Sequence, residues 1–310
     1  MPSPLSHAAD LARHLAHRRA RDRDNAQALT ELLHRPLPLA PGLDLQWLGT
    51  AGYRLTHQGH TLLIDPYWSR APLSSLLLRT PALPDPSLID RYLPDPGTVV
   101  GVLVGHGHFD HALDAPALAR RFGCPVHGST SVARLMALHG LAHRAVTVQP
   151  HHPYELGPFT VTFVPSRHSR IPLGTKVPWP GDTDCTRLGQ LAPQRYGCGQ
   201  TWGIHIDIDG YTLYHQGSAD LVDDQIRHRD VDLFLAGIAG RSVTPRYWQR
   251  ILPLLRPKAL VPCHYDDFLR PLHAPLRFTV DVRLSDLQDE IAAVDPDIAL
   301  AALPAPKGTP

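Results

Sequence analysis

A stretch of seven residues, 105–111, constrains this chain more than any other part of its sequence. It spells Gly-His-Gly-His-Phe-Asp-His and follows the apolar run 99–104, which is typical of a buried strand. Three imidazoles and one carboxylate therefore stand close together at a strand end: His106, His108, Asp110 and His111. Imidazole and carboxylate are suitable ligands for a borderline divalent cation such as zinc. The two glycines allow the tight turn that such convergence requires.

The alternative is a solvated histidine-rich loop, because the chain has 20 histidines in all. A His-x-His-x-Asp-His cluster directly after a strand is less common than scattered histidines, so it favours a metal site. The cluster resembles the motif of the metallo-β-lactamase superfamily. This resemblance implies an α/β fold, namely a four-layer αββα sandwich of two mixed β-sheets flanked by helices.

The resemblance also implies ligands for two metal ions. The first two histidines of the motif bind one ion in the superfamily, and its aspartate and last histidine bind the second. His168 follows the predicted strand 159–164, where the superfamily has the third ligand of the first ion. His264 follows the predicted last core strand, 259–261, where the superfamily has the last ligand of the second ion.

At one point the chain departs from the superfamily pattern. In the superfamily, an aspartate directly follows a glycine at this point and bridges the two ions. This chain has Ser218 after Gly217, and its nearest aspartate, Asp220, stands two positions further on. Three alternatives stay open: Asp220 turns in as the bridge, water takes its place, or the site holds one ion. With Asp220 included, the expected metal ligands are His106, His108, Asp110, His111, His168, Asp220 and His264.

Asp65 ends the predicted strand 61–64, and two roles are open for it. In the superfamily an aspartate at this place orients a metal-binding histidine. A ligating imidazole needs such an acceptor for its other N–H group. Alternatively, Asp65 caps the turn that follows the strand.

The activity implied by the resemblance is that of a metal-dependent hydrolase. A metal-bound hydroxide, available at neutral pH, attacks a small ester, lactone or phosphodiester. Asp110 is the catalytic candidate, because a carboxylate there can orient the nucleophile or take up a proton. We expect zinc, with two ions, although manganese or iron also suits these ligands. The alternatives are an iron-binding redox enzyme of the same fold and a non-catalytic metal-binding protein.

Two further segments bear on the substrate. The proline-rich insert 66–97 carries leucines that either fill the edge of the core or cover an apolar, lipid-like substrate; filling the core is the more common outcome. A later loop carries side chains that suit a carboxylate or phosphate on the substrate: Arg167, Arg170, Lys176 and Trp179.

Three parts of the chain are expected around this centre. Residues 1–42 form an N-terminal helical extension, because leucines recur there at helical spacing until prolines intervene. Residues 43–302 form the metallo-β-lactamase-like domain. Residues 303–310, rich in proline and alanine, form a disordered tail.

Composition argues against several classes of protein. Lys and Arg total 30 against 29 for Asp and Glu, so binding of nucleic acid through bulk charge is not expected. The sequence has no apolar run long enough to span a membrane and no secretory signal pattern. Its four cysteines form no Cys-x-x-Cys pair and suggest no disulfide framework. We therefore expect a cytoplasmic protein that acts on a small molecule; the sequence does not indicate its oligomeric state.

Overall fold

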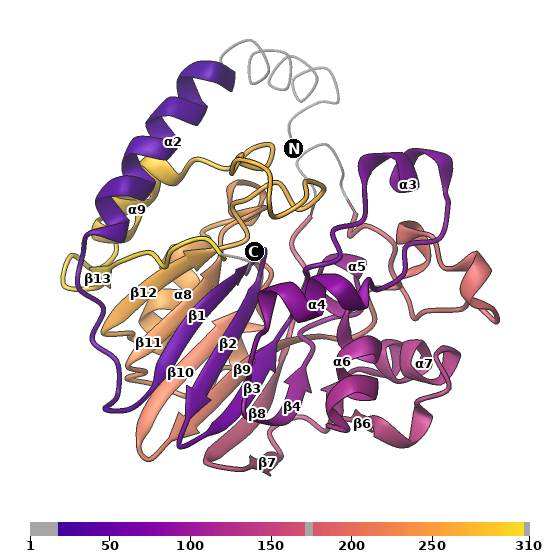
Figure 1. Ribbon diagram of the computed structural model, residues 1–310. Coiled ribbons are helices and arrows are strands. Elements are labelled where there is room, and N and C mark those ends of the chain that lie inside the picture. The colour runs from indigo at the N-terminus through magenta and orange to yellow at the C-terminus, as the bar shows by residue number, and fades with distance from the viewer. Residues whose placement is uncertain (1–17, 171–175, 307–310) are drawn as a thin grey trace.

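The computed structural model describes residues 18–170 and 176–306. Alternating and continuous apolar runs form two mixed β-sheets, which lie against each other in Figure 1. In the first sheet β1 to β3 are antiparallel and β3 to β6 are parallel. Its six strands, which follow sequence order, are β1 (Asp44–Gly49), β2 (Gly52–His57), β3 (His60–Ile64), β4 (Thr98–Leu103), β5 (Val126–Gly128) and β6 (Ala145–Thr147).

The second sheet has seven strands in the order β13-β12-β11-β10-β9-β8-β7. Strands β7 to β10 are antiparallel, and β10 to β13 are parallel. The strands are β7 (Pro153–Leu156), β8 (Phe159–Ser166), β9 (Thr201–Ile208), β10 (Tyr211–Gln216), β11 (Leu233–Gly237), β12 (Ala259–Cys263) and β13 (Ala299–Leu300).

The inner faces of the two sheets are apolar, so each sheet buries the other. Leu55 of β2 and Phe163 of β8 are fully buried members of the same hydrophobic cluster. Removing a side chain of this size from water stabilises the fold by about 2 kcal/mol. A second cluster lies on the outer face of the first sheet, where Val102 of β4 packs with helical leucines.

Helices cover the outer faces and complete the four layers (Figure 1). On the first sheet lie α6 (Ala115–Phe122) and α7 (Thr130–Leu138). On the second sheet lie α8 (Tyr247–Leu255) and α9 (Leu287–Ala292). Short 3-10 turns connect these elements: η1 (Ala142–Arg144), η2 (Leu188–Gln190), η3 (Pro193–Arg195), η4 (Asp223–Gln225), η5 (Arg241–Val243) and η6 (Leu284–Asp286). The expected αββα sandwich is therefore confirmed.

The N-terminal helix α2 (Arg18–Leu33) is fixed to the C-terminal part of the chain. The buried side chain of Asn25 donates to the carbonyl of Val282 at 3.1 Å and accepts from the N–H of Leu284 at 2.7 Å. Residues 1–17 of the predicted extension lie outside the described residues, as do 307–310 of the predicted tail. Within 18–170 and 176–306, no helix combines the length and the apolar character that crossing a membrane requires.

The insert 66–97 contains two short helices, α3 (Leu73–Leu78) and α4 (Pro86–Tyr92). Leu93, at the end of α4, is 0% exposed and fills the edge of the core, as expected. The same expectation is wrong for α3, where Leu77 is 71% and Leu78 is 73% exposed. The reason is that α3 turns Ser75, at 7% exposure, inward in their place.

Candidate metal centre

The motif 105–111 lies where the parallel strands β3 and β4 end side by side. Asp65, directly after β3, accepts a hydrogen bond from the backbone N–H of Gly105 at 2.7 Å and so fixes the start of the motif. Gly107 must be glycine, because a Cβ there would lie 2.2 Å from the carbonyl oxygen of Gly197. The motif ends in the one-turn helix α5 (Phe109–Ala112), all of whose residues are buried.

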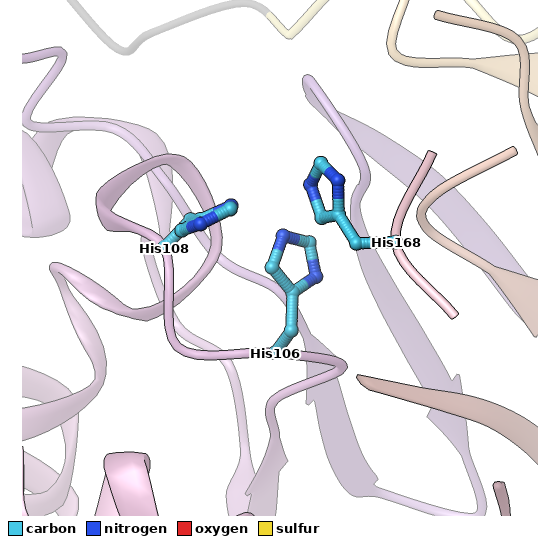
Figure 2. Close-up of side chains that lie close together, drawn as sticks. All are labelled: His106, His108 and His168. Carbon is cyan, nitrogen blue, oxygen red and sulfur yellow. The ribbon is translucent and has the colours of Figure 1, made fainter. Parts of the chain in front are cut away.

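Three histidines from two distant segments form the first group of ligands, here called the histidine trio: His106, His108 and His168. Figure 2 shows their rings converging, two from the motif and one from the segment after β8. The ring centroid of His106 lies 4.8 Å from that of His108 and 4.7 Å from that of His168. One nitrogen of each ring lies within 4.8 Å of the others, which is close enough for all three to bind one ion.

Backbone carbonyls fix the orientation of two of these rings. The Nε2–H of His108 donates to the carbonyl of Pro178 at 2.9 Å, and the Nδ1–H of His168 donates to the carbonyl of Ser169 at 2.6 Å. Each ring therefore keeps its other nitrogen free as a ligand. The Nε2 atom of His106 is buried without a hydrogen-bond partner among the described residues. Such an orphaned acceptor, with two further imidazoles around it, fits a divalent metal ion.

Burial keeps the histidine trio neutral, which is the form that binds metal. Desolvation, assisted by the neighbouring histidines, lowers the pKa of His106 well below its ordinary value. Desolvation likewise lowers the pKa of His108 to about 4 and that of His168 to about 3.

Asp110, His111 and His264 form the second group, here called the acid trio. Their ligand atoms also lie within 4.8 Å of one another, and all three side chains are buried. Inside the group, the Nε2 of His264 lies 3.1 Å from Oδ2 of Asp110. The two trios adjoin, because the ring centroids of His106 and His111 are only 3.8 Å apart.

Asp65 orients the acid trio, which decides between the two roles considered for it. Its Oδ2 accepts a hydrogen bond from Nδ1 of His111 at 2.7 Å, and this leaves Nε2 of that ring for a metal. Burial opposes protonation of His111, but Asp65 and Asp110 outweigh it and raise the pKa of the imidazole. Burial opposes ionisation of Asp110, yet His111 and His264 hold the pKa of its carboxyl well below the usual range.

His264 reaches the acid trio through a strained backbone. It follows β12 directly and has a left-handed φ of 58°. Its N–H donates to the carbonyl of Thr50 at 2.7 Å, which holds this conformation in place. A non-glycine residue in this region is strained, so it persists only where the surrounding contacts hold it.

Asp220, an expected metal ligand, is not brought to either trio. Its Oδ1 accepts hydrogen bonds from Arg250 of α8 at 3.2 Å and from the N–H of Leu221 at 2.8 Å. At the position after Gly217, the hydroxyl of Ser218 accepts from the backbone N–H of Ser169 at 3.0 Å. Ser218 thus anchors the segment that carries a ligand instead of supplying one.

Aromatic side chains line the centre. Trp179, half-buried, lies 5.7 Å from His108 between ring centroids, and Phe268 lies 5.6 Å from His264. Both also contact Phe109. The sequence predicts that Trp179 lies near the substrate. It does not predict a role for Phe268, because a lone aromatic residue in a loop gives no signal of a binding site.

The expected anion-binding residues do not enter the trios. Arg167, Arg170 and Lys176 are exposed. Arg170 lies two residues after His168, and Lys176 two residues before the carbonyl that holds His108, so both flank the histidine trio in sequence.

Comparison with known proteins agrees with this geometry. A family model described as "Beta-lactamase superfamily domain" matches residues 60–265, a range that holds every ligand of both trios. The chain belongs to this superfamily. A UPF0173 metal-dependent hydrolase of Cupriavidus taiwanensis is 32% identical over 264 residues, which cover 78% of this chain and 83% of the relative. A UPF0173 metal-dependent hydrolase of Anaeromyxobacter sp. is 31% identical over 242 residues, 73% of this chain and 75% of the relative. This superfamily member is a metal-dependent hydrolase.

Solved structures share the layer architecture. Igni18, a metallo hydrolase from Ignicoccus hospitalis, has a TM-score of 0.55 at 18% identity over 86% of this chain and 97% of its own. CmlA, a diiron beta-hydroxylase from Streptomyces venezuelae, has a TM-score of 0.54 at 14% identity over 88% of this chain and 55% of its own. At these identities the likeness shows the fold alone.

Proposed function

We propose that this hydrolase cleaves a small ester, lactone or phosphodiester and uses zinc at the two trios. The observation that carries the proposal is the buried Nε2 atom of His106, which has no hydrogen-bond partner among the described residues. It belongs to a neutral histidine trio, and the ring centroid of His106 lies 3.8 Å from that of His111, which Asp65 orients. A buried set of this kind is costly unless a cation satisfies it.

The histidine trio would hold one ion and the acid trio a second. Asp110 is the only carboxylate in the two trios. Asp220 lies outside them and forms an ion pair with Arg250. Zinc is favoured because five of the six ligands are imidazoles. A bound zinc ion supplies Lewis acidity, which makes hydroxide available at neutral pH and stabilises an oxyanion.

The protein's own groups position the reactants. The carbonyls of Pro178 and Ser169 keep His108 and His168 turned inward, and Asp65 does the same for His111. Asp110 stays ionised beside His111, so its carboxylate can accept a hydrogen bond from the attacking water and orient it.

The surroundings of the trios support a substrate with an apolar part and an anionic part. Trp179 and Phe268 offer apolar surface next to the ligands. Arg170 and Lys176, exposed beside the histidine trio in sequence, suit a phosphate or carboxylate. We infer that a lipid-like ester or phosphodiester meets these demands best.

For the setting we propose the cytoplasm and a small-molecule partner rather than nucleic acid. All four cysteines are free thiols in the described residues, as in a reducing compartment. A net charge of +1 gives no bulk attraction to nucleic acid.

The test is turnover by zinc-loaded protein on panels of esters, lactones and phosphodiesters, with His106→Ala as the inactive variant. His143→Ala is the matched control, because His143 is an exposed histidine on η1, outside both trios. Activity on one panel that H106A abolishes and H143A keeps supports the proposal. Full zinc occupancy without turnover on any panel contradicts it. Iron with a visible absorption band, in protein as purified, would favour the redox alternative.

A further inference from the structure

A buried carboxylate outside both trios, that of Asp266, joins two segments that are far apart in the sequence. Its Oδ2 accepts a hydrogen bond from Nη2 of Arg70, in the insert 66–97, at 2.8 Å. Its Oδ1 accepts one from the backbone N–H of Thr50, in the turn between β1 and β2, at 2.9 Å. The side chains of Arg70 and Asp266 are only 2% and 9% exposed. Desolvation offsets much of the attraction in a buried ion pair, so stability is a weak explanation for this one.

Thr50 links Asp266 to the acid trio through its own backbone groups. The N–H of Thr50 donates to Asp266, and its carbonyl accepts the N–H of His264 at 2.7 Å. The indole N–H of Trp47 donates to the same carbonyl at 3.0 Å. Asp266 therefore fixes the turn at Thr50, and the turn in its place fixes the backbone of His264.

Three residues of this network have backbone conformations that side chains disfavour. The φ angles of Thr50, Arg70 and His264 are 51°, 32° and 58°, all in the left-handed region. Such residues are strained and persist only where the surrounding contacts hold them. The carboxylate of Asp266 contacts the first two directly and reaches the third through Thr50. Loss of this carboxylate should therefore let the turn relax and move His264.

Arg70 turns the carboxylate of Asp266 in the direction that this network needs. By holding Oδ2, the guanidinium leaves Oδ1 facing the N–H of Thr50. Space for the guanidinium comes from Gly49, because a Cβ at that position would collide with it. Gly49 also has a φ of 89°, which a side chain would strain.

We propose that Asp266 is a positioning residue for the acid trio and that Arg70 orients it. The carboxylate holds Thr50, and Thr50 holds His264 so that its Nε2 lies 3.1 Å from Oδ2 of Asp110. Asp65 orients His111 through its side chain, whereas Asp266 acts on His264 through the backbone. The inference rests on the proposed function, because it takes the acid trio to be a zinc site.

The experiment compares two double variants that differ in one hydrogen-bond acceptor. Arg70→Met with Asp266→Asn removes both charges but keeps a side-chain oxygen for the N–H of Thr50. Arg70→Met with Asp266→Leu removes the same charges and places a side chain with as many heavy atoms, but without an acceptor. Neither variant leaves an unpaired buried charge, so both should fold, which circular dichroism checks.

Hydrogen exchange of the metal-free proteins, read by mass spectrometry, is the first readout. In R70M/D266L the N–H of His264 should exchange about tenfold faster than in R70M/D266N, because the carbonyl that accepts it is no longer held. Peptides of β9 are the internal reference, since a general loss of stability would accelerate exchange there as well. The second readout is zinc titration with a chelating competitor. R70M/D266L should weaken one of the two sites by about 10- to 100-fold, and R70M/D266N should keep both near wild type.

Equal exchange at His264 in the two double variants overturns the proposal, and so does equal zinc affinity at both of their sites. Faster exchange in R70M/D266L that extends equally to β9 also overturns it, because Asp266 would then serve stability alone. Failure of the proposed function gives a different result, namely wild type that binds no zinc at the trios. The exchange comparison needs no metal, so it decides in that case too whether Asp266 positions His264.

Discussion

The histidine trio and the acid trio are adjacent, yet different groups orient their rings. In the histidine trio, backbone carbonyls bind the outer nitrogens of His108 and His168, and the Nε2 of His106 has no partner in the described residues. In the acid trio, Asp110 and His264 contact each other at 3.1 Å. The Nδ1 of His264 likewise has no partner in the described residues, so both trios hold an unsatisfied buried nitrogen and differ in the groups that orient their rings.

Charge separates the two trios as well. Burial and mutual proximity push the pKa of each imidazole in the histidine trio down, whereas Asp65 and Asp110 push that of His111 up. Burial lowers the pKa of all these imidazoles, and only at His111 do the neighbouring carboxylates of Asp65 and Asp110 outweigh it.

The largest effect is expected from removing the orphaned ligand. His106→Ala should lower kcat/KM by about 1,000-fold or more, because it removes a ligand of the histidine trio and with it the Lewis acid. Steady-state kinetics beside His143→Ala, with zinc content measured on the same samples, checks this. Equal activity in the two variants would mean that catalysis does not depend on the histidine trio.

A smaller effect is expected from loosening the acid trio alone. Asp65→Asn should weaken zinc binding there by about 10- to 100-fold, because His111 loses the carboxylate that fixes its ring. The histidine trio should keep its ion, so zinc titration with a chelating competitor should show one site weakened and one unchanged. Loss of both ions together would contradict the division into two trios.

The carboxyl group of Asp114, four residues after Asp110, extends the comparison to stability. Burial raises the pKa of Asp114 to about 6. Burial acts on Asp110 in the same direction, but the histidines next to Asp110 hold its pKa low. A raised pKa makes the protonated form the stable one, so this contribution is present at low pH and is lost as pH rises toward 6.

From pH 4 to pH 6, wild type should therefore lose about 2 kcal/mol of unfolding free energy relative to Asp114→Asn. Urea denaturation of both proteins across this range measures the difference. Parallel pH profiles would show that Asp114 is not buried as described. The side-chain oxygen of asparagine still accepts the hydrogen bonds from the backbone N–H groups of Trp68 and Ser69. The substitution therefore removes the titrating group and keeps these contacts.

The smallest effect is expected at Asp220, outside both trios. Asp220→Ala should leave zinc content unchanged and cost at most about 1 kcal/mol of stability, because its ion pair with Arg250 is about a quarter exposed. A loss of one zinc ion on this substitution would return Asp220 to the ligand set.

The sequence predicted the fold class and most of the residues that the structure brings together in the two trios. The cluster 105–111 and the strand pattern indicated the sandwich, and His168 and His264 were placed correctly because ligands of this superfamily follow strand ends. Asp220 was misplaced because sequence spacing does not tell which way a side chain leaves a turn, and Arg250, which engages it, lies 30 residues further on.

Other features had no residue-type signal at all. The carbonyls of Pro178 and Ser169, which orient the histidine trio, belong to the backbone. The outward leucines of α3 contradict the ordinary rule that leucine fills a core. Only three-dimensional contacts, such as that of Gln194 with Leu76, reveal which side of this helix faces water.

Anomalous scattering at the zinc edge from crystals of zinc-loaded protein tests the central claim most directly. We expect one peak among His106, His108 and His168 and a second among Asp110, His111 and His264. Zinc density at neither trio, or density at Asp220 in place of one of them, would contradict this account of the centre.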